Sequence, residues 1–159
     1  MLISRRLAAA VALAPIALAK FSLDGNAAPT KQAAVTKKVH RVAMHVTTND
    51  PALISQALNN AQNLFQYYSE KAEQLDVRLV AHGPGLHMLR QDTSTVLERL
   101  SGMKRDLPNL SLAACANTKR NMEKAEGKEI PITSLAEIVP SGVVELVSLQ
   151  ERGWSYLRA

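Results

Sequence analysis

The sequence predicts a three-layer α/β/α fold, in which helices cover both faces of a doubly wound, mostly parallel sheet of five strands. Short apolar segments alternate along the chain with longer segments whose apolar residues recur every three or four positions. This is the pattern of strands that alternate with amphipathic helices. Glycine, proline, aspartate and asparagine separate the segments, as turns and helix caps require. Strands joined through helices pair in parallel, and the helices then cover both faces of the sheet.

The first strand and helix are expected at residues 40–46 and 51–74. Valine and methionine occupy alternating positions in the first of these segments. Asp50 followed by Pro51 is a strong helix start, because aspartate caps free N–H groups and proline fits the first helical position. From Ile54 onwards, apolar residues return at three- and four-residue steps, which gives the helix one buried face.

The middle of the chain is expected to add two strands and two helices. Residues 76–82 form a nearly continuous apolar run, which is typical of a strand covered on both faces. Gly-Pro-Gly at 83–85 then ends the strand as a turn, and it lacks the third glycine of a dinucleotide-binding motif. A helix at 93–104 leads to the third strand at 110–115, and Asn117 is expected to cap the helix that follows.

The last part of the chain completes the predicted sheet. Residues 137–139 are expected to form a short strand. Ser141 is expected to cap a helix that ends at Gly153, because glycine just past the last turn is a common stop signal. A final short strand is expected at 154–157.

The first residues have the pattern of an export signal. Arg5 and Arg6 precede thirteen uncharged residues, 7–19. This length suits the apolar region of a signal peptide and is too short to span a bilayer. Small residues permit cleavage after Ala19 or after Ala27, and the Sec and twin-arginine routes both stay open. An uncleaved N-terminal anchor is the alternative interpretation.

We therefore expect a signal peptide at 1–27, a flexible tether at 28–38 and one α/β domain at 39–159 in the periplasm of a bacterium. The chain has 159 residues and a formal charge of +5. Loss of three basic residues and one acidic residue with the signal segment leaves +3. Aromatic residues make up only 4% of the chain and the basic residues are scattered, so the sequence does not favour nucleic-acid binding. A single cysteine excludes an intramolecular disulfide.

Chemistry is expected at the carboxyl ends of the strands, where parallel α/β sheets place their sites. Cys115 ends the third predicted strand and comes just before a predicted helix. The free N–H groups and the positive dipole end of that helix favour thiolate over thiol, and the thiolate is the form that attacks sulfur or binds metal. A buried cysteine that packs as a small apolar residue is the alternative.

Four segments of the chain resemble the DsrE/DsrF-like family: 41–46, 80–85, 113–118, and 139–147 with 150–154. They include His-Gly-Pro-Gly, Ala-Cys-Ala-Asn-Thr and Pro-Ser-Gly-Val-Val, and the resemblance covers nearly the whole predicted domain. It implies a doubly wound α/β/α fold and assembly into trimers or hexamers. In some members, it also implies a sulfur relay in which a cysteine at the end of a central strand carries a persulfide. Cys115 matches that cysteine, although the relay members are cytoplasmic and this chain has an export signal.

Two functions are consistent with these residues. In the first, Cys115 holds a persulfide in a sulfur carrier or sulfurtransferase-like protein, which exchanges sulfur with a donor or acceptor protein and needs no metal or organic cofactor. In the second, the domain is a non-enzymatic, oligomeric binding or assembly module with a ligand cleft at the strand ends. The candidate residues of this cleft are His82, His87, Asn117, Thr118 and Asn49.

A nitrogen–sulfur metal site is a further alternative. His82 and His87 flank the glycine turn, and His45 lies near the end of the first strand. With Cys115 they offer ligand types that zinc prefers. Their spacing matches no standard zinc motif, and a histidine at a strand end more often makes a local hydrogen bond. We therefore expect no metal.

Overall fold

The computed structural model describes residues 38–159. The predicted signal peptide at 1–27 lies outside the described residues, and so does the predicted tether apart from Lys38. Within the described part of the chain, no helix is both long enough and apolar enough to cross a membrane.

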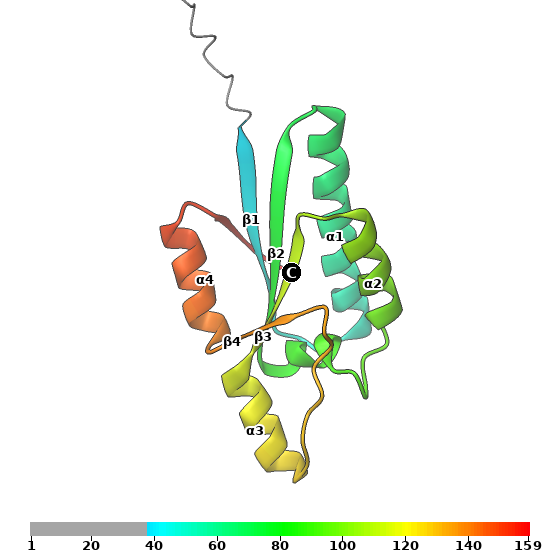
Figure 1. Cartoon of the computed structure of the whole chain (residues 1–159), viewed down its shortest axis with the longest axis vertical. Helices are drawn as coiled ribbons and strands as arrows, with labels where there is room; N and C mark the ends of the chain where they lie inside the picture. Colours follow the sequence, from blue (N-terminus) through cyan, green and yellow to red (C-terminus); the bar gives the residue numbers. More distant parts are fainter. Residues whose placement is uncertain (1–37) are drawn as a thin grey trace, which may run out of the picture. The chain divides into compact units, whose positions relative to one another are not determined.

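Five parallel strands form one sheet in the order β4-β3-β2-β1-β5 (Figure 1). The strands are β1 (Val39–Val46), β2 (Gln74–Ala81), β3 (Leu110–Cys115), β4 (Glu137–Val139) and β5 (Ser155–Arg158). The predicted α/β/α fold with five strands is confirmed, and the pairing is parallel throughout the sheet. Because the strands run the same way, their carboxyl ends meet at one edge.

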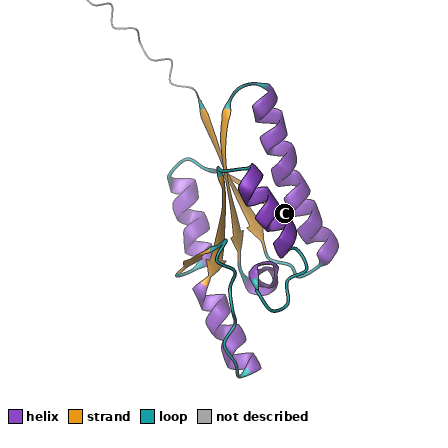
Figure 2. Cartoon of the chain, turned by 45° about the vertical axis from the view of Figure 1, so that its right-hand side comes forward, coloured by secondary structure: helices purple, strands orange, loops and turns teal. Residues whose placement is uncertain are grey.

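Helices cover the two faces of this sheet unequally. They are α1 (Pro51–Glu70), the 3-10 helix η1 (Gly83–Leu89), α2 (Leu97–Asp106), α3 (Ala116–Glu126) and α4 (Gly142–Glu151). α1 and α2 lie on one face and α4 lies on the other (Figures 1 and 2). The larger cluster of buried residues fills the first face and includes Met44, Leu79 and Leu112 from the strands. α3 extends beyond the carboxyl edge of the sheet (Figure 1).

Small residues line the sheet beneath α4. Ala43, Val80 and Ala113 come from β1, β2 and β3, and they form a second buried cluster with two leucines of α4. Short side chains on the strands let the helix pack close to the sheet. Since side chains alternate between the two faces of a strand, Cys115 at the end of β3 lies on this same face.

The caps of α1 and α4 form as predicted. The Asp50 carboxylate accepts hydrogen bonds from the N–H groups of Ala52 and Leu53 at 2.7 and 3.2 Å. The Ser141 hydroxyl accepts from the N–H of Val144 at 3.5 Å. α1 nevertheless ends earlier than predicted, where the backbone turns into a left-handed conformation two residues past its last turn.

The segment between β2 and α2 is more regular than predicted. The Gly-Pro-Gly turn is the start of η1, and Gly85 packs so tightly on β1 that a Cβ atom there would lie 2.2 Å from the carbonyl oxygen of Val46. α2 begins at Leu97, later than predicted. In the loop before it, the Ser94 hydroxyl donates to the Met88 carbonyl at 2.7 Å, so the loop closes on η1 before the helix starts.

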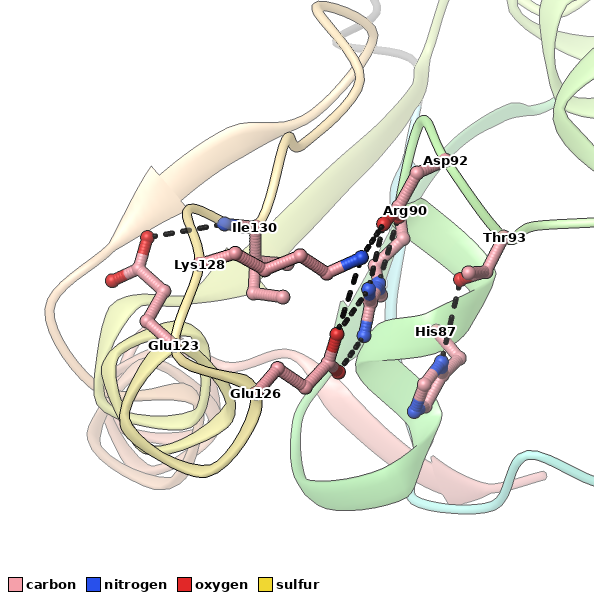
Figure 3. Close-up of polar contacts among 8 residues, drawn as sticks. All are labelled: His87, Arg90, Asp92, Thr93, Glu123, Glu126, Lys128 and Ile130. Carbon is pink, nitrogen blue, oxygen red and sulfur yellow. Dashed lines mark hydrogen bonds and ion pairs between the residues drawn. The ribbon is translucent and has the colours of Figure 1, made fainter.

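Arg90 anchors the carboxyl end of α3, a helix without any fully buried residue. Its side chain is only 1% exposed and lies between Asp92 and Glu126 (Figure 3). Arg90 donates to the Asp92 carboxylate at 2.7 and 2.9 Å and to Glu126 Oε2 at 2.9 Å. Lys128 adds a contact to Asp92 at 3.3 Å. Hydrogen bonds from Arg90 hold the pKa values of both carboxyl groups below their usual range.

Replacement of Arg90 is expected to destabilise the fold. Arg90→Met leaves two carboxylates facing each other without their buried counter-ion, and we expect the free energy of unfolding to fall by about 2 kcal/mol. Arg105→Met is the matched control, because the ion pair of Arg105 with Asp106 is exposed and such pairs contribute at most about 1 kcal/mol. Urea denaturation measures both, and equal losses in the two variants would contradict the role of Arg90.

The same ion pairs predict how stability depends on pH. Carboxyl groups whose folded pKa is lowered contribute stability above their unfolded pKa, and this contribution is lost as pH falls through the lowered values. In the wild type, protonation of Asp92 and Glu126 at low pH should lower the free energy of unfolding. We expect this loss of stability with falling pH to be smaller in Arg90→Met.

Candidate functional site

Cys115 ends β3 and is itself the N-cap of α3. Its backbone is extended, and its sulfur accepts a hydrogen bond from the N–H of Thr118 at 3.4 Å. The predicted cap at Asn117 is therefore wrong, since the helix already begins at Ala116. The Asn117 side chain is exposed and accepts from Arg120, and it is the Asn117 backbone N–H that faces the sulfur.

A second helix directs its amino end at the same sulfur. Gly142 is the first residue of α4, and its N–H also hydrogen bonds with Cys115. A Cβ atom on Gly142 would lie 3.0 Å from the Cβ of His82 and 3.3 Å from the Cβ of Cys115. Only glycine leaves this close approach free of strain. Gly142 was not predicted as a site residue from the sequence. A glycine directly after the Ser141 cap, where a better helix former is usual, is nevertheless a signal for a close contact.

These contacts decide the ionisation of Cys115. The residue is 4% exposed, and burial raises the pKa of its thiol. Hydrogen bonds from the Thr118 side chain and from the backbone N–H groups of Gly142, Thr118 and Asn117 outweigh burial, so the net pKa lies below its ordinary value. The two cations nearest the start of α3 are engaged elsewhere, because Lys119 pairs with Glu123 and Arg120 donates to the Asn117 side chain. The thiolate is therefore stabilised by aligned dipoles rather than by a neighbouring cation.

Two histidines and a tyrosine form a row on the same face of the sheet. His45 Nε2 and His82 Nε2 lie 2.5 Å apart, and His45 Nδ1 lies 2.8 Å from the hydroxyl of Tyr156. Burial lowers the pKa of both histidines, and the neighbouring His82 and Arg158 lower that of His45 further. Tyr156 was not predicted as a site residue. It lies near His45 because β5 pairs with β1, and the sequence does not reveal which strands are neighbours.

The Cys115 sulfur and its hydrogen-bond donors in Thr118, Asn117 and Gly142 form the sulfur site. His87 and Asn49 lie beside it, in a separate groove. The groove has a volume of about 420 Å³, and Asn49, Gly83, His87 and Thr118 are among its lining residues. His87 Nδ1 contacts the Thr93 hydroxyl at 3.4 Å (Figure 3). Thr118 belongs to both the groove and the sulfur site, because it lines the groove and its side chain hydrogen bonds with Cys115. The Thr118 hydroxyl also accepts the N–H of Gly83 at 2.9 Å. Of the predicted cleft residues, the structure thus brings His82, Thr118 and the Asn117 backbone to Cys115, and places His87 and Asn49 next to them.

The candidate site is neither a cluster of metal ligands nor part of the hollow of about 630 Å³ between α1 and α2. Among residues 38–159, no three side chains of histidine, cysteine, aspartate or glutamate gather where they would hold a metal ion. That hollow is lined by Phe65, Tyr68 and Met103 among others. It shares no residue with the candidate site.

Comparison with known proteins gives a structural relative of the fold but no relative of known chemistry. No family model matches the chain, and no curated protein matches it. A solved structure of a protein of unknown function, MTH1491 from Methanobacterium thermoautotrophicum, is 27% identical and superposes with a TM-score of 0.63. The match covers 76% of this chain and 99% of that protein. The chain is similar to that protein over the α/β/α domain, which supports the fold described above.

Removal of one donor is expected to shift the ionisation of Cys115. Thr118→Val keeps the shape of the side chain and deletes the hydroxyl that stabilises the thiolate, so the pKa of Cys115 should rise. At neutral pH, alkylation by iodoacetamide should then slow several-fold, and its midpoint should move to higher pH. Thr95→Val, at an exposed position outside the site, is the control. An unchanged midpoint in Thr118→Val would show that the hydroxyl does not stabilise the thiolate.

Proposed function

We propose that this protein is a sulfur carrier of the DsrE/DsrF type, in which Cys115 holds a persulfide. The observation that supports the proposal most strongly is the convergence of the α3 and α4 amino ends on the Cys115 sulfur, with the hydrogen bonds that lower the pKa of its thiol. A persulfide carrier needs a thiolate that attacks sulfur and later leaves as a thiolate, and the same donors favour both steps.

The proposed reaction exchanges sulfur between thiols. The Cys115 thiolate attacks the outer sulfur of a donor persulfide, R–S–SH. A sulfur–sulfur bond to Cys115 forms, the bond within the donor breaks, and the donor leaves as the thiolate R–S⁻ with that electron pair. Transfer to an acceptor repeats the step in reverse, so neither a metal nor an organic cofactor is needed. The partners are proteins or small molecules that carry a thiol or a persulfide.

The second candidate is a non-enzymatic binding module. Two observations favour it: Cys115 is only 4% exposed, and a groove of about 420 Å³ opens beside it with Asn49, His87 and Thr118 in its lining. In this alternative, the groove binds a small polar ligand and the cysteine is structural. The presence or absence of sulfur on Cys115 separates the two functions.

Mass spectrometry of the native protein tests the sulfur carrier and its location together. The export pattern of the first residues supports a periplasmic protein with a cleaved signal peptide, and protein from the periplasmic fraction should begin within residues 20–28. A fraction of it should carry the mass of one or more extra sulfur atoms on Cys115, and this mass should disappear with dithiothreitol and in Cys115→Ser. Unmodified Cys115 after incubation with polysulfide would favour the binding module, and uncleaved protein in the cytosol would contradict export.

Exposed apolar residues support an oligomer. Val143, Val144 and Val147 of α4 are 57%, 62% and 48% exposed, although α4 is the helix that covers its face of the sheet. Such surfaces mark contacts between proteins. Together with the family resemblance, they support a homo-oligomer, a trimer or hexamer, that assembles through α4.

A charge placed in this surface is expected to dissociate the oligomer. The wild type should scatter light as a trimer or hexamer at micromolar concentration, and Val144→Glu should give a monomer because burial of an unpaired carboxylate is unfavourable. Leu53→Glu is the control, since Leu53 is 44% exposed on α1, on the other face. A monomeric wild type, or a Val144→Glu protein of unchanged mass, would contradict assembly through α4.

A further inference from the structure

The row of Tyr156, His45 and His82 crosses the sheet from solvent to the sulfur site. Tyr156 lies on the edge strand β5 and is 41% exposed. His45 lies on β1 and bonds to both of its neighbours in the row. His82 follows β2, and its Cβ and ring approach Gly142 at the point where the Cβ of Cys115 also approaches it.

Two arrangements of protons are compatible with the two hydrogen bonds of this row. In one, His82 Nε2–H donates to His45 Nε2, and His45 Nδ1–H donates to the Tyr156 oxygen. In the other, the Tyr156 hydroxyl donates to His45 Nδ1, and His45 Nε2–H donates to His82 Nε2. Each imidazole uses one nitrogen as donor and the other as acceptor. The change from the first arrangement to the second takes up one proton at His82 Nδ1 and releases one from Tyr156.

We propose that Tyr156, His45 and His82 form a proton relay that removes the proton of an acceptor thiol when Cys115 passes on its sulfur. The proposal rests on the sulfur-carrier function proposed above. Both histidines have a lowered pKa and are therefore neutral at pH 7, which is the state that can take up a proton. The charged group whose field reaches His45 is Arg158 of β5. On the other side of the row, Gly142 of α4 packs against His82 and against Cys115 of β3.

The relay balances the transfer step. The acceptor thiol, R–SH, gives its proton to His82 as its sulfur attacks the outer sulfur of the Cys115 persulfide. A sulfur–sulfur bond forms in the acceptor, the bond to Cys115 breaks, and Cys115 keeps that electron pair as the thiolate. His82 passes its other ring proton to His45, His45 passes one to Tyr156, and the Tyr156 hydroxyl releases one to water. One proton thus leaves the site for each sulfur transferred.

The pH dependence of transfer tests the relay. The full-length protein is loaded with inorganic polysulfide, and transfer to 2-mercaptoethanol is followed by stopped flow on both sides of the pKa of this thiol. At low pH, where the acceptor is protonated, Tyr156→Phe and His82→Asn should transfer about 10- to 100-fold more slowly than the wild type. At high pH, the acceptor is already a thiolate, and all three proteins should transfer at the same rate.

Control variants and three distinct outcomes make the test decisive. Tyr67→Phe and His40→Gln, on α1 and at the start of β1, should behave as the wild type at every pH. Slower transfer at all pH values in Tyr156→Phe, or an unchanged profile in both relay variants, would overturn the relay and leave the sulfur carrier standing. Failure of the wild type to take up sulfur on Cys115 would overturn both proposals.

Discussion

The free N–H groups at the amino ends of α3 and α4 need an acceptor, and the sulfur of Cys115 receives hydrogen bonds from both helices. An α-helix leaves its first N–H groups without partners inside the helix, and at this edge of the sheet two helices begin within reach of one atom. A thiolate satisfies these donors better than a thiol, because it adds a negative charge at the positive end of each dipole. The ionisation of Cys115 is therefore a property of how the two helices are placed.

Several distant contacts maintain that placement. Gly142 lets α4 begin against Cys115, and Ala43, Val80 and Ala113 let the rest of the helix lie close to the sheet. α3 lacks fully buried residues of its own, so its direction depends on the cap at one end and on Arg90 at the other. The buried Arg90 thus contributes to the sulfur site although it touches none of its atoms.

Local signals in the sequence were sufficient for the order of the elements and for much of the site. Asp50 before Pro51 and the Ser141 cap are patterns read within one turn of a helix, and both formed as predicted. Cys115 and His82 follow strands, so a parallel sheet had to bring them to one edge. Asn117 was predicted as the cap because asparagine is in general a preferred capping residue. The prediction is wrong because the helix begins one residue earlier, and the sulfur of Cys115 accepts the N–H of Thr118. Tyr156 required the knowledge that β5 pairs with β1, which no local pattern contains.

The proposed sulfur-carrier function depends most directly on the ionisation state of Cys115. The ultraviolet absorbance of the thiolate, recorded against pH for the folded wild type and corrected with Cys115→Ser, measures it without any reagent that must enter the site. We predict a single transition below the pKa of a free cysteine, which is about 8.5. A transition at or above that value would mean that burial outweighs the helix N–H groups, and it would contradict a persulfide site at Cys115.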